Sequence, residues 1–234
     1  MVDRRLTVAV LALALVAAAA ASTPSAIAQS PAPSFAIEAH SRSDVPKYEK
    51  FTYDTATAVG VSDAAAARID ATISTAVSAS VRRAVKASAR CLANAAKCGV
   101  YEGQLVPVPC IGGYLCILNH VDGYNPGAAT GYKEVDAFVF DPATGARVSV
   151  ADEVTPAAMP AFVTSVKAQV EAYEKKHGFY NAFFVDFIRA KEIQHWAPMA
   201  NGIRLWFDKY VAAPGYVGVV SLVVPYPSTA TIRP

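Results

Sequence analysis

The hydrophobic and polar positions of the chain predict two long helices. In the segment 62–97, apolar residues recur every four positions and define one buried face. Ser62 is placed to act as the N-cap of this helix. A second stripe with helical spacing occupies Thr155–Gly178, where the glycine ends the helix. Pro160 lies inside this stripe and favours a helix start at Met159.

Strands are predicted where apolar and polar residues alternate. The segments are 48–53, 112–120, 135–141 and the closing pair within Asn201–Tyr226. Turns rich in Gly, Pro and Asp separate them, and these turns are too short for the crossover that a parallel pair requires. The order of helix, strands, helix and strands predicts an α+β fold, an antiparallel sheet with two main helices packed on it.

The N-terminus has the pattern of a secretory signal peptide. Arg4 and Arg5 precede an apolar run over 6–21, and Ala26-Ile27-Ala28 provides a small-x-small cleavage pattern. We expect cleavage after the last of these alanines, and an uncleaved membrane anchor is the alternative.

Residues 29–50 are rich in Ser, Pro and Ala and predict a flexible N-terminal arm, followed by a single α+β domain over 51–234. The mature protein is therefore expected to be secreted, extracellular or periplasmic, associated with the cell envelope, and without a membrane span.

Four cysteines follow the predicted signal peptide: Cys91, Cys98, Cys110 and Cys116. An even number in an oxidising compartment predicts two disulfides. Their spacing favours the two local pairings, Cys91 with Cys98 and Cys110 with Cys116, and leaves crossed pairing open. Zinc binding is the weaker alternative, because neither spacing is that of a zinc knuckle.

Charge and motifs exclude several function classes. The chain has 21 basic and 19 acidic residues, and this near balance argues against a nucleic-acid partner. No G-x-S-x-G elbow, paired metal-binding histidines or phosphate-cradling glycine pattern is present. We therefore expect no catalytic residue, no metal and no cofactor.

The closing strands carry the candidate binding residues. Strand alternation places Trp206 between the charged residues Arg204 and Asp208 on the face opposite the core. Tyr210 and Tyr216 flank the loop that follows. That tryptophan is either a binding patch or is covered by the N-terminal arm or a helix. A histidine and a second tryptophan are expected in the loop that enters these strands. The candidates are Arg204, Trp206, Asp208, Tyr210, Tyr216, His195 and Trp196.

Two segments carry a resemblance to a known family. "AFVFDPATGARVSVADEV", followed by a helix and "ANGIRLWFDKYVAAPGYVGVVSLVVPY", resembles an exported bacterial family of unknown function that includes RsiV-type anti-sigma factor ectodomains and the mycobacterial secreted immunogenic MPT-type antigen. The similarity covers about residues 110–226. Relatives commonly carry a histidine in a turn where this chain reads "GYNPGAATG", so no role of that histidine is transferred. The matching residues are Asp141, Thr144, Gly145, Val150, Asn201, Gly202, Phe207, Asp208, Tyr210, Ala213, Pro214, Gly218 and Pro225.

The resemblance implies an α+β sheet and a binding function, because the RsiV branch senses lysozyme by direct contact. We therefore expect a secreted, non-enzymatic domain that binds a protein or cell-envelope component, with a lysozyme-like hydrolase as the family-level suggestion for its partner. Two alternatives stay open. One is an esterase-like hydrolase that uses His195 with a nearby Ser or Asp, and the other is a structural or antigenic envelope protein.

Overall fold

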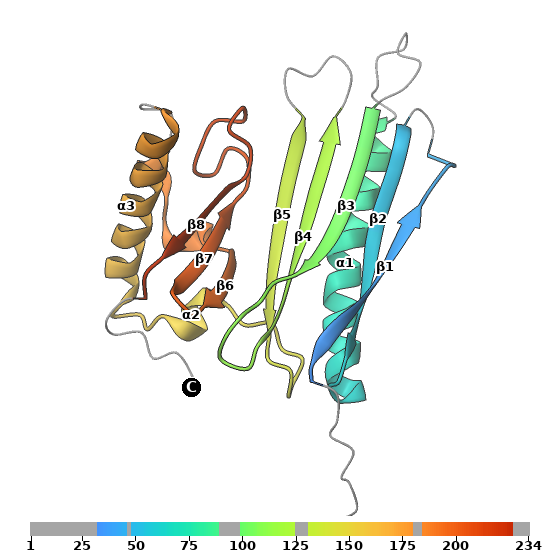
Figure 1. The fold of residues 1–234 in the computed structure, drawn as a ribbon, viewed down its shortest axis with the longest axis horizontal. Coiled ribbons are helices and arrows are strands. Elements are labelled where there is room, and N and C mark those ends of the chain that lie inside the picture. The colour runs from blue at the N-terminus through green and yellow to red at the C-terminus, as the bar shows by residue number, and fades with distance from the viewer. Residues whose placement is uncertain (1–31, 46–47, 89–98, 125–130, 180–183, 227–234) are drawn as a thin grey trace, which may run out of the picture. The chain divides into compact units, whose positions relative to one another are not determined.

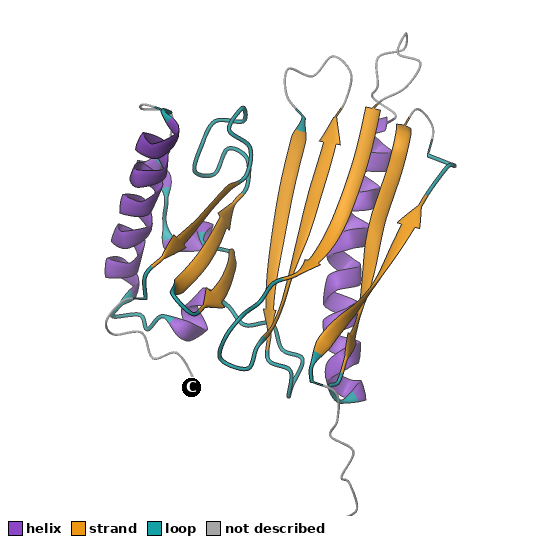
Figure 2. Ribbon diagram, in the orientation of Figure 1, coloured by secondary structure: helices purple, strands orange, loops and turns teal. Residues whose placement is uncertain are grey.

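The computed structural model describes residues 32–45, 48–88, 99–124, 131–179 and 184–226. All of them belong to one compact unit. Their strands form two β-sheets, each accompanied by one long helix (Figures 1 and 2). This arrangement is an α+β fold, as the sequence pattern predicts.

The larger sheet has five strands: β1 (Ser34–Ser41), β2 (Tyr48–Val59), β3 (Gly99–Pro107), β4 (Leu115–Tyr124) and β5 (Tyr132–Phe140), in that spatial order. Neighbouring strands are antiparallel, except that β2 and β3 are parallel. The parallel pair corrects the expectation of a purely antiparallel sheet. It arises because the chain between these two strands passes through a long helix, which supplies the crossover.

That helix, α1 (Asp63–Ser88), lies against one face of the five-stranded sheet (Figure 1). The predicted N-cap is confirmed, since the N–H of Ala65 donates to Ser62 Oγ at 3.3 Å. Ile69 and Ile73 are fully buried and share a core with Phe138 of β5. The four-residue repeat of apolar positions therefore marks the face that contacts the sheet.

The N-terminal arm expected over residues 29–50 is wrong for Ser34–Ser41. This segment is β1, and every residue of it pairs with β2. Its short and mixed side chains, "SFAIEAHS", alternate too weakly to mark a strand, and most of them are exposed. In the described part of the chain β1 pairs only with β2, so it is an edge strand.

The smaller sheet has three antiparallel strands: β6 (His195–Met199), β7 (Gly202–Phe207) and β8 (Val220–Val224), with β7 in the middle. The helical segments that precede it are α2 (Val150–Glu153), α3 (Met159–His177), η1 (Val185–Phe187) and η2 (Ala190–Glu192). Helix α3 starts at Met159 and is capped by left-handed Gly178, both as predicted.

The two sheets share one hydrophobic core. Val135 and Ala137 of β5 belong to the same buried cluster as Phe162 of α3 and Leu205 of β7. No helix among the described residues has the length and hydropathy needed to cross a membrane.

The predicted bridge between Cys110 and Cys116 is present, with 6.2 Å between their Cα atoms. Cys91 and Cys98 lie outside the described residues, so their pairing stays a prediction.

Candidate functional site

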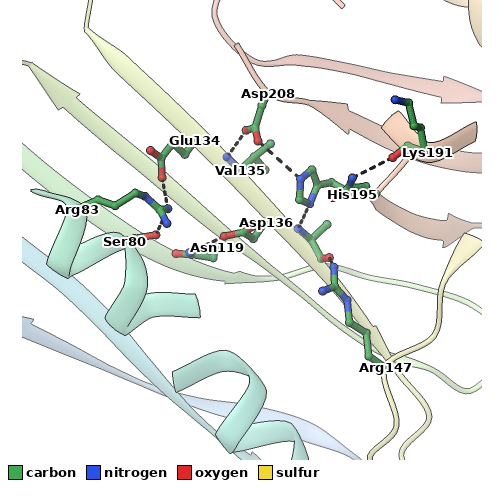
Figure 3. Close-up of polar contacts among 12 residues, drawn as sticks. Ser80, Arg83, Asn119, Glu134, Val135, Asp136, Arg147, Lys191, His195 and Asp208 are labelled. Atoms are coloured by element: carbon green, nitrogen blue, oxygen red, sulfur yellow. Dashed lines mark hydrogen bonds and ion pairs between the residues drawn. The ribbon is translucent and has the colours of Figure 1, made fainter. Parts of the chain in front are cut away.

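Much of the outer edge of β5 is covered by side chains of β6 and of the loop after β7 (Figure 3). The N–H of Val135 donates to Asp208 Oδ1 at 2.7 Å, and the N–H of Ala137 donates to His195 Nδ1 at 3.2 Å. Lys209 Nζ donates to the carbonyl oxygen of Gly131 at 2.8 Å. We call Asp208, His195 and Lys209 the β5 clamp, because they satisfy edge groups that would otherwise attract a foreign strand.

The hydrogen bonds of the clamp determine its protonation. Because Nδ1 of His195 accepts the Ala137 N–H, the neutral ring carries its hydrogen on Nε2, which lies 3.7 Å from Asp208 Oδ2. Burial lowers the pKa of His195. Burial also raises the pKa of Asp208 to about 6, and the Val135 N–H opposes this shift. Near neutral pH the pair is therefore a neutral imidazole beside a carboxylate.

This geometry makes the clamp a structural contact between the two sheets. One ring nitrogen of His195 accepts a backbone N–H, and the other faces a carboxylate. A general base for a serine hydroxyl needs a free nitrogen within hydrogen-bond reach of that hydroxyl. The contacts of His195 with described residues leave no such nitrogen, so the arrangement does not favour the hydrolase alternative.

On its other side, next to α1, β5 carries a second polar cluster (Figure 3). Arg83 of α1 pairs with Glu134 and also donates to Ser80 Oγ at 2.9 Å. Asn119 of β4 and Asp136 lie side by side, with 3.5 Å between Nδ2 and Oδ2. These contacts fix the helix to the sheet, and most of the charges in the cluster have a partner of opposite sign.

A different region gathers exposed aromatic side chains. Phe184, Phe187, Tyr210, Val211 and Glu192 line a pocket of about 410 Å³, which we call the aromatic pocket. The Phe187 side chain is 72% exposed and Tyr210 is 65% exposed. The rings of Phe184 and Phe187 meet edge to face with centroids 6.3 Å apart. Large apolar side chains grouped on a surface in this way mark interaction sites.

The backbone around Tyr210 holds the pocket in place. Tyr210 has φ = 70°, a left-handed conformation that is unfavourable for an aromatic residue. Its N–H donates to the carbonyl oxygen of Ala213, and the N–H of Phe184 donates to that of Ala212. Gly215 lies close beside it, since a Cβ there would lie 2.4 Å from the end of the Tyr210 ring and would displace that side chain. The chain therefore holds this exposed ring in a strained position.

Further aromatic rings extend from the same loop towards the end of α3. Tyr216 contacts Phe179 with centroids 6.3 Å apart, and Phe179 stacks near His177 at 6.3 Å. His177 in turn lies 4.0 Å from the ring of Tyr173. The loop after β7 and the end of α3 thus carry a second group of aromatic side chains, of a kind that favours contacts with partners.

The candidate residues do not form one surface. Tyr210 and Tyr216 are exposed, as a contact surface requires. Asp208 and His195 are brought together, but in the β5 clamp. Arg204 is half-buried, with its guanidinium 6.0 Å from the centroid of the Trp206 ring.

Trp206 is only 6% exposed, so it is not an exposed binding patch, and the alternative of a covered tryptophan holds. Trp206 shares its face of the sheet with His195, its partner in the register, and that face meets β5. Trp206 belongs to the buried cluster that it shares with residues of β5. Trp196 is also buried, and it lies in β6 together with His195 and not in the predicted loop.

Sequence reasoning missed Phe184, Phe187 and Glu192. They belong to the stretch "FFVDFIRAKE", whose apolar residues follow neither a helical nor a strand period. The available signal was its density of aromatic residues outside any regular element.

Several solved structures share this fold, including two DUF3298 family proteins. One is a DUF3298 family protein from Pseudomonas aeruginosa PAO1, with a TM-score of 0.55 and 15% identity over 83% of this chain and 90% of that chain. The other is a DUF3298 family member from Bacteroides fragilis NCTC 9343, with a TM-score of 0.57 and 12% identity over 84% and 92% of the two chains. At such identities the likeness concerns the fold alone. The sequence matches no family model and no curated protein.

Proposed function

We propose that the protein is a secreted, non-enzymatic binding domain, and that its partner is a protein or another component of the cell envelope. The contact surface is the aromatic pocket with its neighbours Tyr216 and Phe179. Export is inferred from the signal-peptide pattern and agrees with the disulfide between Cys110 and Cys116.

The observation that carries the proposal is the exposed ring of Tyr210 in a left-handed backbone conformation. A strained residue persists only where the surrounding structure imposes it, and such residues cluster at ligand contacts. Two exposed phenylalanines in the same pocket add apolar area that a partner would remove from water.

The resemblance to RsiV-type ectodomains and to the MPT-type antigen supports the same proposal at a finer level. It favours a protein partner, and a lysozyme-like hydrolase is the family-level suggestion. The alternative is an antigenic or structural role in the envelope, which predicts that substitutions in the aromatic pocket do not change the retention of a partner.

Affinity capture tests the proposal. The purified domain is incubated with envelope extract or host secretions, and retained proteins are quantified by mass spectrometry. We expect Phe187→Ala and Tyr210→Ala to lose the retained partner, with Phe187→Ala costing about 1–3 kcal/mol of binding free energy. Tyr124→Ala is the matched control, because Tyr124 is an exposed aromatic residue that does not line the pocket. Equal retention by all four proteins would contradict the proposed surface.

Ester hydrolysis is assayed on the same samples with p-nitrophenyl esters. Turnover that disappears in His195→Ala, while the variant remains folded by circular dichroism, would favour the esterase-like alternative instead.

A further inference from the structure

We propose that the aromatic pocket receives a positively charged group, namely a lysine or arginine side chain of the partner or another organic ammonium. This inference rests on the proposed binding function and names the chemistry of the ligand. It combines two features of the pocket: aromatic rings whose faces attract cations, and a carboxylate, that of Glu192, among the lining groups.

The aromatic walls are suited to a cation with an apolar stem. Phe184, Phe187 and Tyr210 contribute three rings, and each ring face carries the negative lobe of its quadrupole. The loop already contains one such contact, since Lys209 Nζ lies 5.3 Å from the centroid of the Tyr210 ring. Val211 provides an aliphatic surface against which methylene groups pack.

Glu192 makes the site selective for positive charge. Its Oε2 is shielded from solvent and has no hydrogen-bond partner among the described residues. A shielded carboxylate oxygen without a donor is unfavourable, and a charged N–H donor satisfies it better than a neutral one. Because Glu192 lines the pocket, its carboxylate is available to an ammonium or guanidinium that binds there.

The cations already near the pocket do not neutralise this oxygen. Lys191 Nζ lies 3.5 Å from the other oxygen, Oε1, and its side chain is 81% exposed, so the pair contributes little. Arg189 donates to the backbone carbonyl of Asp186. Lys209 Nζ donates to the carbonyl of Gly131 in the β5 clamp. Among the described residues, an incoming cation therefore competes with the exposed Lys191 for the carboxylate and with Lys209 for the face of the Tyr210 ring.

Nuclear magnetic resonance titration with small probes tests the inference. The labelled protein is titrated with N-acetyl-lysine N-methylamide, with the arginine analogue, and with the uncharged norleucine analogue of the same length. We expect the two charged probes to shift the signals of Phe187, Tyr210 and Val211. The norleucine probe is expected to bind about tenfold more weakly, because it lacks the cation–π and carboxylate contacts.

Two variants assign the selectivity. Glu192→Gln keeps the shape of the side chain and is expected to lower the affinity of the lysine probe about tenfold, while the norleucine probe is unaffected. Glu171→Gln, at an exposed position of α3, is the matched control and leaves both unchanged.

Three results would overturn the inference: equal affinity for the lysine and norleucine probes, no effect of Glu192→Gln, or no shifts at the pocket up to about 50 mM probe. If partner capture still depends on Phe187 in that case, the binding function stands and only the charge of the ligand is wrong.

Discussion

Asp208 carries its charge where two sheets meet, and burial raises its pKa to about 6. The unfolded value is about 3.9, so folding favours the protonated carboxyl. The contribution of this residue to stability is fully present below about pH 4 and is lost as the pH rises through about 6. Asp208→Asn retains an acceptor for the Val135 N–H but does not ionise.

We therefore expect the free energy of unfolding of Asp208→Asn, relative to that of the wild type, to increase as the pH is raised from 4.5 to 8. The gain is about 1–2 kcal/mol, reduced from the full shift because the side chain is 35% exposed. Urea unfolding at the two pH values measures it, with the exposed Asp186→Asn as control. A pH-independent difference would show that Asp208 is not desolvated in the fold.

Gly145 and Gly178 form a matched pair for a second residue-level prediction. Both have φ near 70°, but a Cβ on Gly145 would lie 2.4 Å from the carbonyl oxygen of Ala65, whereas Gly178 has open space. Gly178→Ala is expected to cost about 1 kcal/mol for the backbone conformation alone. Gly145→Ala is expected to cost about 3 kcal/mol, because the turn is pushed away from α1. Equal losses in thermal or urea unfolding would contradict the close contact.

At the scale of elements, the alternation of backbone groups in β1 can be tested with proline. The N–H of Arg42 donates to the carbonyl of Phe51, and the regular register continues from there. The N–H groups of even-numbered residues therefore point towards β2, and those of odd-numbered residues point to the free edge.

We expect Ala36→Pro to destabilise the protein by about 3 kcal/mol, because it removes a bond to β2 and places the proline ring against that strand. Ala39→Pro is expected to cost less than about 1 kcal/mol, since its N–H faces the free edge. Both alanines are exposed, so unfolding free energies compare only the backbone effect. The reverse order would mean that the pairing of β1 is shifted by one residue.

The sequence predicted elements well where one period dominates. The four-residue repeat of α1, the cap at Gly178 and the closing pair β7 and β8 were all expected. It missed β3, which follows the predicted end of the first helix, and β6, whose five residues include Pro198. It also missed β1, where small side chains give no contrast between faces. Short strands leave too few positions for a period to be recognised.

Candidate site residues were harder to place than elements, for a physical reason. Alternation correctly put Arg204 and Trp206 on one face of β7, but it cannot tell whether that face meets water or a second sheet. Residues of β5, more than sixty positions earlier in the chain, belong to the same buried cluster as Trp206. The aromatic pocket likewise contains residues from η1 and from the loop after β7, and no local sequence pattern predicts that these two segments come together.

At the scale of the whole unit, the two sheets are joined by several independent contacts. The β5 clamp supplies polar contacts, and the shared core supplies apolar ones. The loop closed by Cys110 and Cys116 adds another, since the N–H of Ile111 donates to the carbonyl of Pro198 in β6 at 3.1 Å. Sheets joined in this way are expected to unfold together.

Replacing both Cys110 and Cys116 with alanine tests this coupling. The loop is short, so loss of the bridge is expected to lower the free energy of unfolding by about 2 kcal/mol. Tryptophan fluorescence reports on Trp196 and Trp206 in the smaller sheet, and far-ultraviolet circular dichroism reports on both sheets and their helices. Because one core spans both sheets, the two signals are expected to change at the same urea concentration in the wild type and in the variant. If fluorescence changes first in the variant, the disulfide loop is what couples the smaller sheet to the larger one, and the shared core alone is too weak to do so.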